Sequence, residues 1–214
     1  MGHATKKTPY FDIDINSDSK NILVIQKWKY EWLANGFSEW TYPQKEDYHK
    51  KFEKAITSAW NNKAKVKISG TSDFAKENTS KVFTIMFDIK WVITNAHWHV
   101  VVCKQNKFDS IKRPVVKWSE NKIELYTMDI IPVGKKGAPK GLLQTNVSHE
   151  FGHSIGNHSY IKGMHNDEYR KTSSFYDEKT SIMNFGMEVK VRHFDYLLKI
   201  LKEMLPNTKF DISV

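Results

Sequence analysis

The sequence lacks the features of a disulfide-stabilised or membrane-spanning chain. Its 214 residues include one cysteine, Cys103, so no intrachain disulfide can form. No stretch approaches the roughly 18 consecutive apolar residues that mark a transmembrane helix. Residues 1–20 contain no continuous apolar run of the kind found in a secretory signal peptide. We therefore expect a globular chain with no membrane span and no visible Sec signal.

Charge and hydrophobic content favour a folded, basic protein. Hydrophobic side chains make up 40% of the chain, and 33 Lys and Arg against 24 Asp and Glu give a net charge of +9. This balance excludes a disordered or fibrous chain and favours acidic partners. There is no repeat and no low-complexity segment. We expect a single domain over 1–214, with a sheet subdomain over about 20–157 and a C-terminal subdomain over about 158–214.

Hydrophobic periodicity predicts an α+β fold. Apolar stripes predict amphipathic helices over 43–60 and 193–205. Alternating or β-branched runs predict strands over 22–28, 64–69, 82–93, 96–104, 113–118 and 122–131. We expect the three consecutive strands between 64 and 104 to form an antiparallel meander. Pro114 indicates that its strand lies at an edge of the sheet.

A further helix is expected near Thr145, after a glycine- and proline-rich loop over 132–141. It contains the sequence His-Glu-x-x-His. At about 100° per residue, His149 and His153 lie on one face, so both imidazoles can bind one ion. Glu150 projects beside that ion, where it can take a proton from zinc-bound water. The opposite face, which can bury against the sheet, carries Val147, Phe151 and Ile155. The other interpretation is a surface helix with two solvated histidines.

The residues after this motif resemble those of metzincin metallopeptidases. HEFGHSIGNHSY matches HExxHxxGxxH through Gly156, but Ser159 stands at the third-ligand position and His158 falls one residue early. Further on, Ser181–Asn184 resembles the Met-turn, and a predicted helix follows it. Phe185 stands where astacins place a metal-binding tyrosine. The resemblance implies a zincin-like mixed sheet with an active-site helix, a Met-turn and a C-terminal helix.

The same region resembles metallopeptidase toxin domains of bacterial type VI secretion spike proteins, in which Asp-Glu-Tyr follows the active helix. Here that segment is Asp167-Glu168-Tyr169. The resemblance implies Glu168 as the third zinc ligand. The alternatives that remain open are Asp167, His158 and His165. The other interpretation of Asp167 and Glu168 is an ordinary acidic loop that binds no metal.

An Arg-His pair after the Met-turn is also shared with these toxins. The resemblance implies His193 as the donor that stabilises the oxyanion during catalysis. The alternatives for this role are Arg192, Tyr169 and Tyr176. The other interpretation of His193 is a non-catalytic residue that makes a local hydrogen bond at the start of the last helix.

Together these residues predict a zinc-dependent endopeptidase. Glu150 would act as general base and acid on a zinc-activated water, and His149, His153 and Glu168 would bind Zn²⁺. The resemblance implies a secreted antibacterial or host-directed effector that acts on a protein substrate in a target cell, with the periplasm as one site of action. An acidic immunity protein is its expected partner. The alternative is a basic nucleic-acid-binding or nuclease-type toxin. No recognised nucleic-acid motif supports that alternative, so we expect no nucleic-acid partner.

Overall fold

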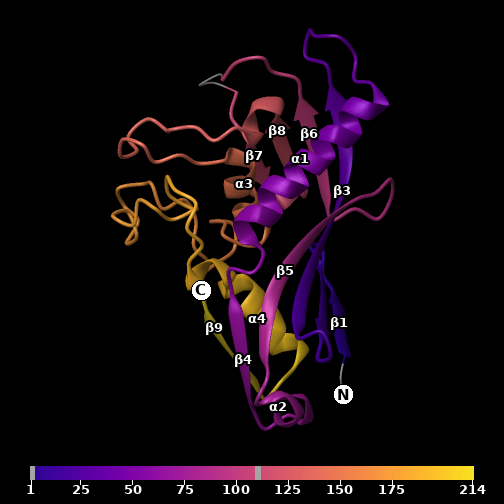
Figure 1. Cartoon of the computed structure of the whole chain (residues 1–214), viewed down its shortest axis with the longest axis vertical. Coiled ribbons are helices and arrows are strands. Elements are labelled where there is room, and N and C mark those ends of the chain that lie inside the picture. The colour runs from indigo at the N-terminus through magenta and orange to yellow at the C-terminus, as the bar shows by residue number, and fades with distance from the viewer. Residues whose placement is uncertain (1–2, 109–111) are drawn as a thin grey trace.

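The computed structural model describes residues 3–108 and 112–214, which form a mixed α+β fold (Figure 1). The strands are β1 (His3–Lys7), β2 (Asp12–Asn16), β3 (Asn21–Leu33), β4 (Lys65–Gly70), β5 (Val82–Trp91), β6 (Trp98–Cys103), β7 (Val115–Lys117), β8 (Lys122–Tyr126) and β9 (Thr208–Ser213). The helices are α1 (Tyr42–Trp60), α2 (Asp73–Asn78), α3 (Asn146–Ser154) and α4 (Asp195–Met204), and the 3₁₀ turns are η1 (Trp118–Glu120), η2 (Thr127–Ile130) and η3 (Val191–Phe194). Within the described ranges, no helix is both long and apolar enough to cross a membrane.

The sheet is organised around the long strand β3. The strand order is β7-β8-β6-β3-β5-β4-β9, and the β1–β2 hairpin joins through β2. Strand β3 pairs in parallel with β5 and, through its C-terminal half, in parallel with β6. The predicted antiparallel meander is therefore wrong: β4 and β5 are antiparallel, but β3 separates β5 from β6. Alternation of apolar residues determines which side chains share a face of a strand. It does not determine which other strand pairs with that strand.

Most predicted elements are confirmed, with shifted ends. Helix α1 begins after Thr41, which forms a capping box with Gln44, and Pro43 lies in its first turn. The predicted strand over 122–131 ends at Tyr126 and continues as η2. Strand β7 lies at the sheet edge, as Pro114 indicated. The short elements β1, β2, β9 and α2 were not predicted, although Ile13 and Ile15 alternate along β2 and are buried.

Helix α3 is buried between the sheet and α1. Its apolar face carries Val147, Phe151 and, just past the helix, Ile155, all nearly inaccessible as predicted. On one side, the Trp60 indole of α1 donates to the Ser148 carbonyl at 2.9 Å. On the other, the Gln26 amide of β3 donates to the Ser154 carbonyl at 3.1 Å. These bonds satisfy buried polar groups and fix the helix in place.

Gly156 follows α3 in a backbone conformation that favours glycine, with φ of +118°. A Cβ atom there would lie 2.3 Å from the Cβ of Tyr196. We expect Gly156→Ala to lower the free energy of unfolding by about 2–4 kcal/mol, because backbone strain and steric overlap add. Gly36→Ala is the matched control, since Gly36 has φ of +83° and open space around it. Urea denaturation should show that Gly36→Ala lowers the free energy of unfolding by about 1 kcal/mol. Equal losses in the two variants would contradict the role of the Tyr196 contact.

Candidate metal centre

Two histidines of α3 converge with one aspartate of the loop that follows it. One ligand-type atom from each of His149, His153 and Asp167 lies within 4.8 Å of the other two. The Nε2 atoms of His149 and His153 are 3.4 and 3.2 Å from Asp167 Oδ1. The exposed fractions of the three side chains are only 3%, 9% and 10%. The three side chains can therefore hold one metal ion away from bulk water.

Backbone carbonyls orient both imidazoles. Nδ1 of His149 donates to the Ile182 carbonyl at 2.7 Å, and Nδ1 of His153 donates to the Asn157 carbonyl at 2.5 Å. With the hydrogen on Nδ1, the Nε2 lone pair of each ring faces Asp167. Asp167 Oδ1 is itself buried without a hydrogen-bond donor. Lone pairs and a carboxylate oxygen repel one another unless a cation lies between them, so this donor set fits a divalent metal ion such as zinc.

The protonation of the three groups follows from burial and from their mutual contacts. Burial and the nearby Lys135 ammonium lower the pKa of His149 to about 4. Burial also acts to lower the pKa of His153, but Asp167 and Glu150 outweigh it and raise that pKa. Burial acts to raise the pKa of Asp167, yet its contacts with both histidines hold that pKa well below its usual range. Asp167 is thus anionic and His149 neutral at pH 7, as metal binding requires, whereas the raised pKa of His153 means that an ion would have to displace a proton there.

Glu150 lies beside this cluster and is 8% exposed. Burial raises the pKa of its carboxyl group, and repulsion from Asp167 adds to the shift. The backbone N–H of Val116, on the edge strand β7, donates to the carboxylate and partly opposes that rise. A fixed carboxylate with a raised pKa is suited to proton transfer near neutral pH.

The structure does not bring the predicted third ligand, Glu168, into the histidine–aspartate cluster. Glu168 accepts hydrogen bonds from Arg192, Nε to Oε1 at 2.6 Å and Nη2 to Oε2 at 3.0 Å, and is 1% exposed. Successive side chains project to different sides of the loop, so Glu168 faces Arg192 while Asp167 faces the histidines. Burial alone would raise the pKa of Glu168, but hydrogen bonds from His193, Arg192 and Ser181 lower it to about 2. Asp167, one of the open alternatives, takes the place expected for Glu168.

The two remaining alternatives for the third ligand are engaged elsewhere. His158 Nε2 donates to the Val116 carbonyl at 3.2 Å, and its Nδ1 accepts from the Tyr160 N–H at 3.1 Å. His165 Nε2 lies 3.1 Å from Asp195 Oδ2. Neither residue belongs to the group of potential metal ligands.

His193 does not take the predicted catalytic position. It is 1% exposed, and its Nδ1 accepts from the Lys190 N–H at 3.0 Å. Its Nε2 faces Glu168 Oε1 and Ser181 Oγ, each at 3.3 Å. Because both ring nitrogens are engaged, neither is available to a substrate oxyanion. His193 instead makes the local hydrogen bond at the start of the last helix that the other interpretation of the sequence expected.

Tyr169, Lys135 and Arg170 are further polar side chains near the cluster. The Tyr169 ring lies 6.2 Å from the ring of His149. Burial and the Asp167 carboxylate raise the pKa of its phenol, so it stays protonated and can donate. Burial lowers the pKa of Lys135, while Glu150 and Asp167 oppose that shift. Sequence reasoning had named Tyr169 as an alternative donor, but no spacing rule could have placed Lys135, which comes from the 132–141 loop.

The loop that resembles a Met-turn packs directly against α3. Met183 is fully buried, and its Sδ would lie 2.5 Å from a Cβ at Gly152, so a larger residue between the two histidines would require Met183 to shift. The Gln144 side-chain amide donates to the carbonyls of Ile182 and Gly186 at 2.8 and 2.7 Å. These bonds hold in place the Ile182 carbonyl that orients His149.

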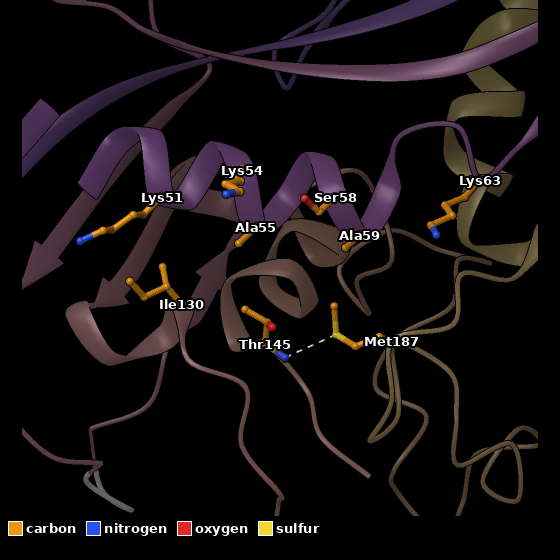
Figure 2. Close-up of a pocket in the computed structure, with 9 residues that line it drawn as sticks. All are labelled: Lys51, Lys54, Ala55, Ser58, Ala59, Lys63, Ile130, Thr145 and Met187. Carbon is orange, nitrogen blue, oxygen red and sulfur yellow. Dashed lines mark hydrogen bonds between the residues drawn. The ribbon is translucent and has the colours of Figure 1, made fainter. Parts of the chain in front are cut away.

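A separate pocket of about 460 Å³ lies beside α1 (Figure 2). The N–H of Thr145 contacts the sulfur of Met187 at 3.4 Å there. The residues that line the pocket are Lys51, Lys54, Ala55, Ser58, Ala59, Lys63, Ile130, Thr145 and Met187. None of them belongs to the histidine–aspartate cluster, so the pocket is distinct from the candidate metal centre.

Comparisons with protein-family models, with curated proteins and with solved structures find no match for this chain. Any assignment of function therefore depends on its own residues. Those that bear on it most directly are the two histidines, Asp167 and Glu150.

Arg192→Met would leave Glu168 buried without its cationic partner. We expect a loss of about 3–5 kcal/mol in the free energy of unfolding at pH 7. Glu168 has a folded pKa of about 2 against an ordinary value of 4.5, so its contribution is complete above pH 4.5 and lost as the pH falls towards 2. The difference from wild type should therefore shrink at pH 3. Urea denaturation of metal-free protein at both pH values measures it.

Lys50→Met is the control for that measurement, because Lys50 pairs with Glu46 at 2.9 Å on the exposed face of α1. We expect Lys50→Met to lower the free energy of unfolding by less than about 0.5 kcal/mol. An Arg192→Met loss that stayed the same at pH 7 and pH 3 would contradict the assigned role of the Glu168–Arg192 pair.

Proposed function

We propose that this protein is a zinc-dependent endopeptidase of the zincin type, with His149, His153 and Asp167 as zinc ligands. The observation that carries the proposal is the convergence of two Nε2 lone pairs and a buried carboxylate oxygen that has no hydrogen-bond donor. Two imidazoles and one carboxylate are a typical protein ligand set for catalytic zinc, which keeps its fourth position open.

Glu150 would serve as general base and then as general acid. A bound zinc ion would supply Lewis-acid polarisation of the scissile carbonyl and lower the pKa of a water molecule. The Glu150 carboxylate would accept the proton of the attacking water and transfer it to the nitrogen of the departing amine. Its raised pKa favours both transfers near neutral pH. The Val116 N–H would keep the carboxylate oriented between the two steps.

Tyr169 is the better candidate for the oxyanion donor that sequence analysis had assigned to His193. Its phenol stays protonated and lies beside His149. A donor aimed at developing negative charge is among the largest contributions to catalysis of acyl transfer. Lys135 would add a positive charge on the side of Glu150 and Asp167.

The order of elements supports the zincin interpretation. Every described strand except β9 precedes the histidine helix, a loop with a buried methionine packs against that helix, and helix α4 follows. The role of a secreted effector acting in a target cell, countered by an acidic immunity protein, is proposed from the sequence resemblance. The net charge of +9 supports an acidic partner.

Purified protein should bind one zinc ion per chain. Asp167→Asn keeps the shape of the side chain but removes the anionic ligand, so we expect zinc affinity to fall by more than about a hundredfold. Glu168→Gln should lower zinc affinity only about tenfold, because Glu168 contacts Arg192 rather than the zinc ligands. Competition against a chelating dye measures both variants. Retention of zinc by Asp167→Asn together with its loss from Glu168→Gln would restore Glu168 as the ligand, and absence of zinc from wild type would contradict the function.

Glu150→Gln should separate zinc binding from catalysis. We expect zinc affinity close to that of wild type and peptide cleavage slower by about 10²–10⁴-fold, because an amide cannot accept the proton. Quenched fluorescent peptides and zinc-loaded protein give the rate. Glu46→Gln, on the exposed face of α1, is the matched control and should leave the rate unchanged. A Glu150→Gln protein with the wild-type rate would remove Glu150 from the mechanism.

A further inference from the structure

The two loops that flank the metal centre carry an excess of positive charge. Residues 131–144 lead into α3, residues 159–172 contain Asp167, and Figure 1 shows both projecting from the same side of the molecule. Their basic side chains are Lys135, Lys136, Lys140, Lys162, Arg170 and Lys171. The acidic side chains in these two segments are Asp167 and Glu168, which turn towards the histidines and Arg192. The outward charge of both loops is therefore positive.

Two of these cations lie at the metal centre itself. Arg170 Nη2 is 3.3 Å from Asp167 Oδ2, and its side chain is 63% exposed. Lys135 is half-buried and lies near enough to Glu150 and Asp167 for both carboxylates to act on its ammonium group. The other four basic side chains are exposed. Positive charge thus extends from the ligands to the surface of both loops.

The next segment of the chain does not offset this charge. Residues 173–180 contain Asp177, Glu178 and Lys179. Glu178 accepts a hydrogen bond from Arg192 at 3.0 Å, which turns it towards the buried ion pair. With Glu178 paired to Arg192, the charges of Asp177 and Lys179 cancel, so this segment does not offset the positive charge of the two loops.

We propose that the substrate of this peptidase is an acidic segment of polypeptide, selected by the cations of the two loops. The inference rests on the proposed peptidase function and adds a substrate class to it. Surfaces lined by one sign of charge concentrate ligands of the opposite sign and speed their association. Side chains such as Lys136 and Lys140 would meet Asp or Glu residues that flank the scissile bond, while Lys135 and Arg170 would act closest to the reacting carbonyl.

A nucleic acid is the other polyanion that these cations would attract, and the metal centre favours polypeptide. Metal-dependent cleavage of phosphodiesters commonly uses two metal ions about 4 Å apart. Over residues 3–108 and 112–214, a single group of three potential ligands was found, and it has room for one ion. Glu150 beside that group supplies the proton acceptor and donor that amide hydrolysis needs.

The test uses zinc-loaded protein and three quenched peptides of one scaffold, with Glu, Gln or Lys at the positions that flank the cleaved bond. Wild type should cleave the Glu peptide at least about tenfold more efficiently than the Gln peptide, and the Lys peptide least, with differences that shrink in 0.5 M salt. The double variant Lys136→Gln/Lys140→Gln should lower kcat/KM for the Glu peptide about fivefold and leave the Gln peptide unchanged. Zinc content is measured for every protein.

The matched control is Lys67→Gln/Lys76→Gln, which makes the same change in net charge. Both residues are exposed, on β4 and α2 at the far end of the molecule (Figure 1). The control should cleave all three peptides as wild type does. A loss in the control equal to that in the loop variant would overturn the assignment to the two loops.

Equal cleavage of the three peptides by wild type would overturn the acidic preference while leaving the peptidase function intact. Failure of zinc-loaded wild type to cleave any of them would overturn both. In that case, binding of a fluorescent single-stranded RNA with affinity that falls steeply as salt rises would identify nucleic acid as the polyanion.

Discussion

The placement of Asp167 against two imidazoles depends on the ion pair that its neighbour Glu168 makes with Arg192. Glu168 is almost completely buried, and an unpaired carboxylate at that depth would be strongly unfavourable. Arg192 binds both of its oxygens, and His193 and Ser181 complete the hydrogen bonding. With Glu168 fixed in this direction, the preceding side chain is directed to the opposite side, where the histidines lie. The loop therefore brings Asp167 to the candidate metal centre because Glu168, the next residue, is anchored in the protein interior.

Helix α3 provides the rigid half of the same site. It is fixed to α1 through Trp60 and to the sheet through Gln26, and its imidazoles are oriented by main-chain carbonyls. Gly152 lets Met183 pack against the helix between the two histidines, which brings the Ile182 carbonyl within reach of His149. Packing and polar contacts thus fix the directions of both Nε2 lone pairs before any ion binds, which reduces the entropic cost of assembling the site.

Prediction from the sequence was most accurate where residues close in the chain determine the outcome. The apolar stripe of α1, the burial of one face of α3 and the shared face of His149 and His153 all follow from helical period. The antiparallel meander was wrong because the pairing of β3 with both β5 and β6 is a long-range choice. The resemblance implied Glu168 and left Asp167 open, because neighbouring carboxylates in a loop are equivalent until distant groups, here Arg192 and the two histidines, distinguish them.

By itself, the sequence determined that His149, Glu150 and His153 share a helix with one polar and one apolar face, because 3.6 residues per turn impose that geometry. The same holds for the basic composition of the chain. Only the tertiary structure decided that Asp167 completes the cluster, that His193 and Glu168 are buried with Arg192, and that Lys135 reaches the site. Each of these outcomes is a contact between segments far apart in the chain, settled by burial and charge compensation rather than by local periodicity.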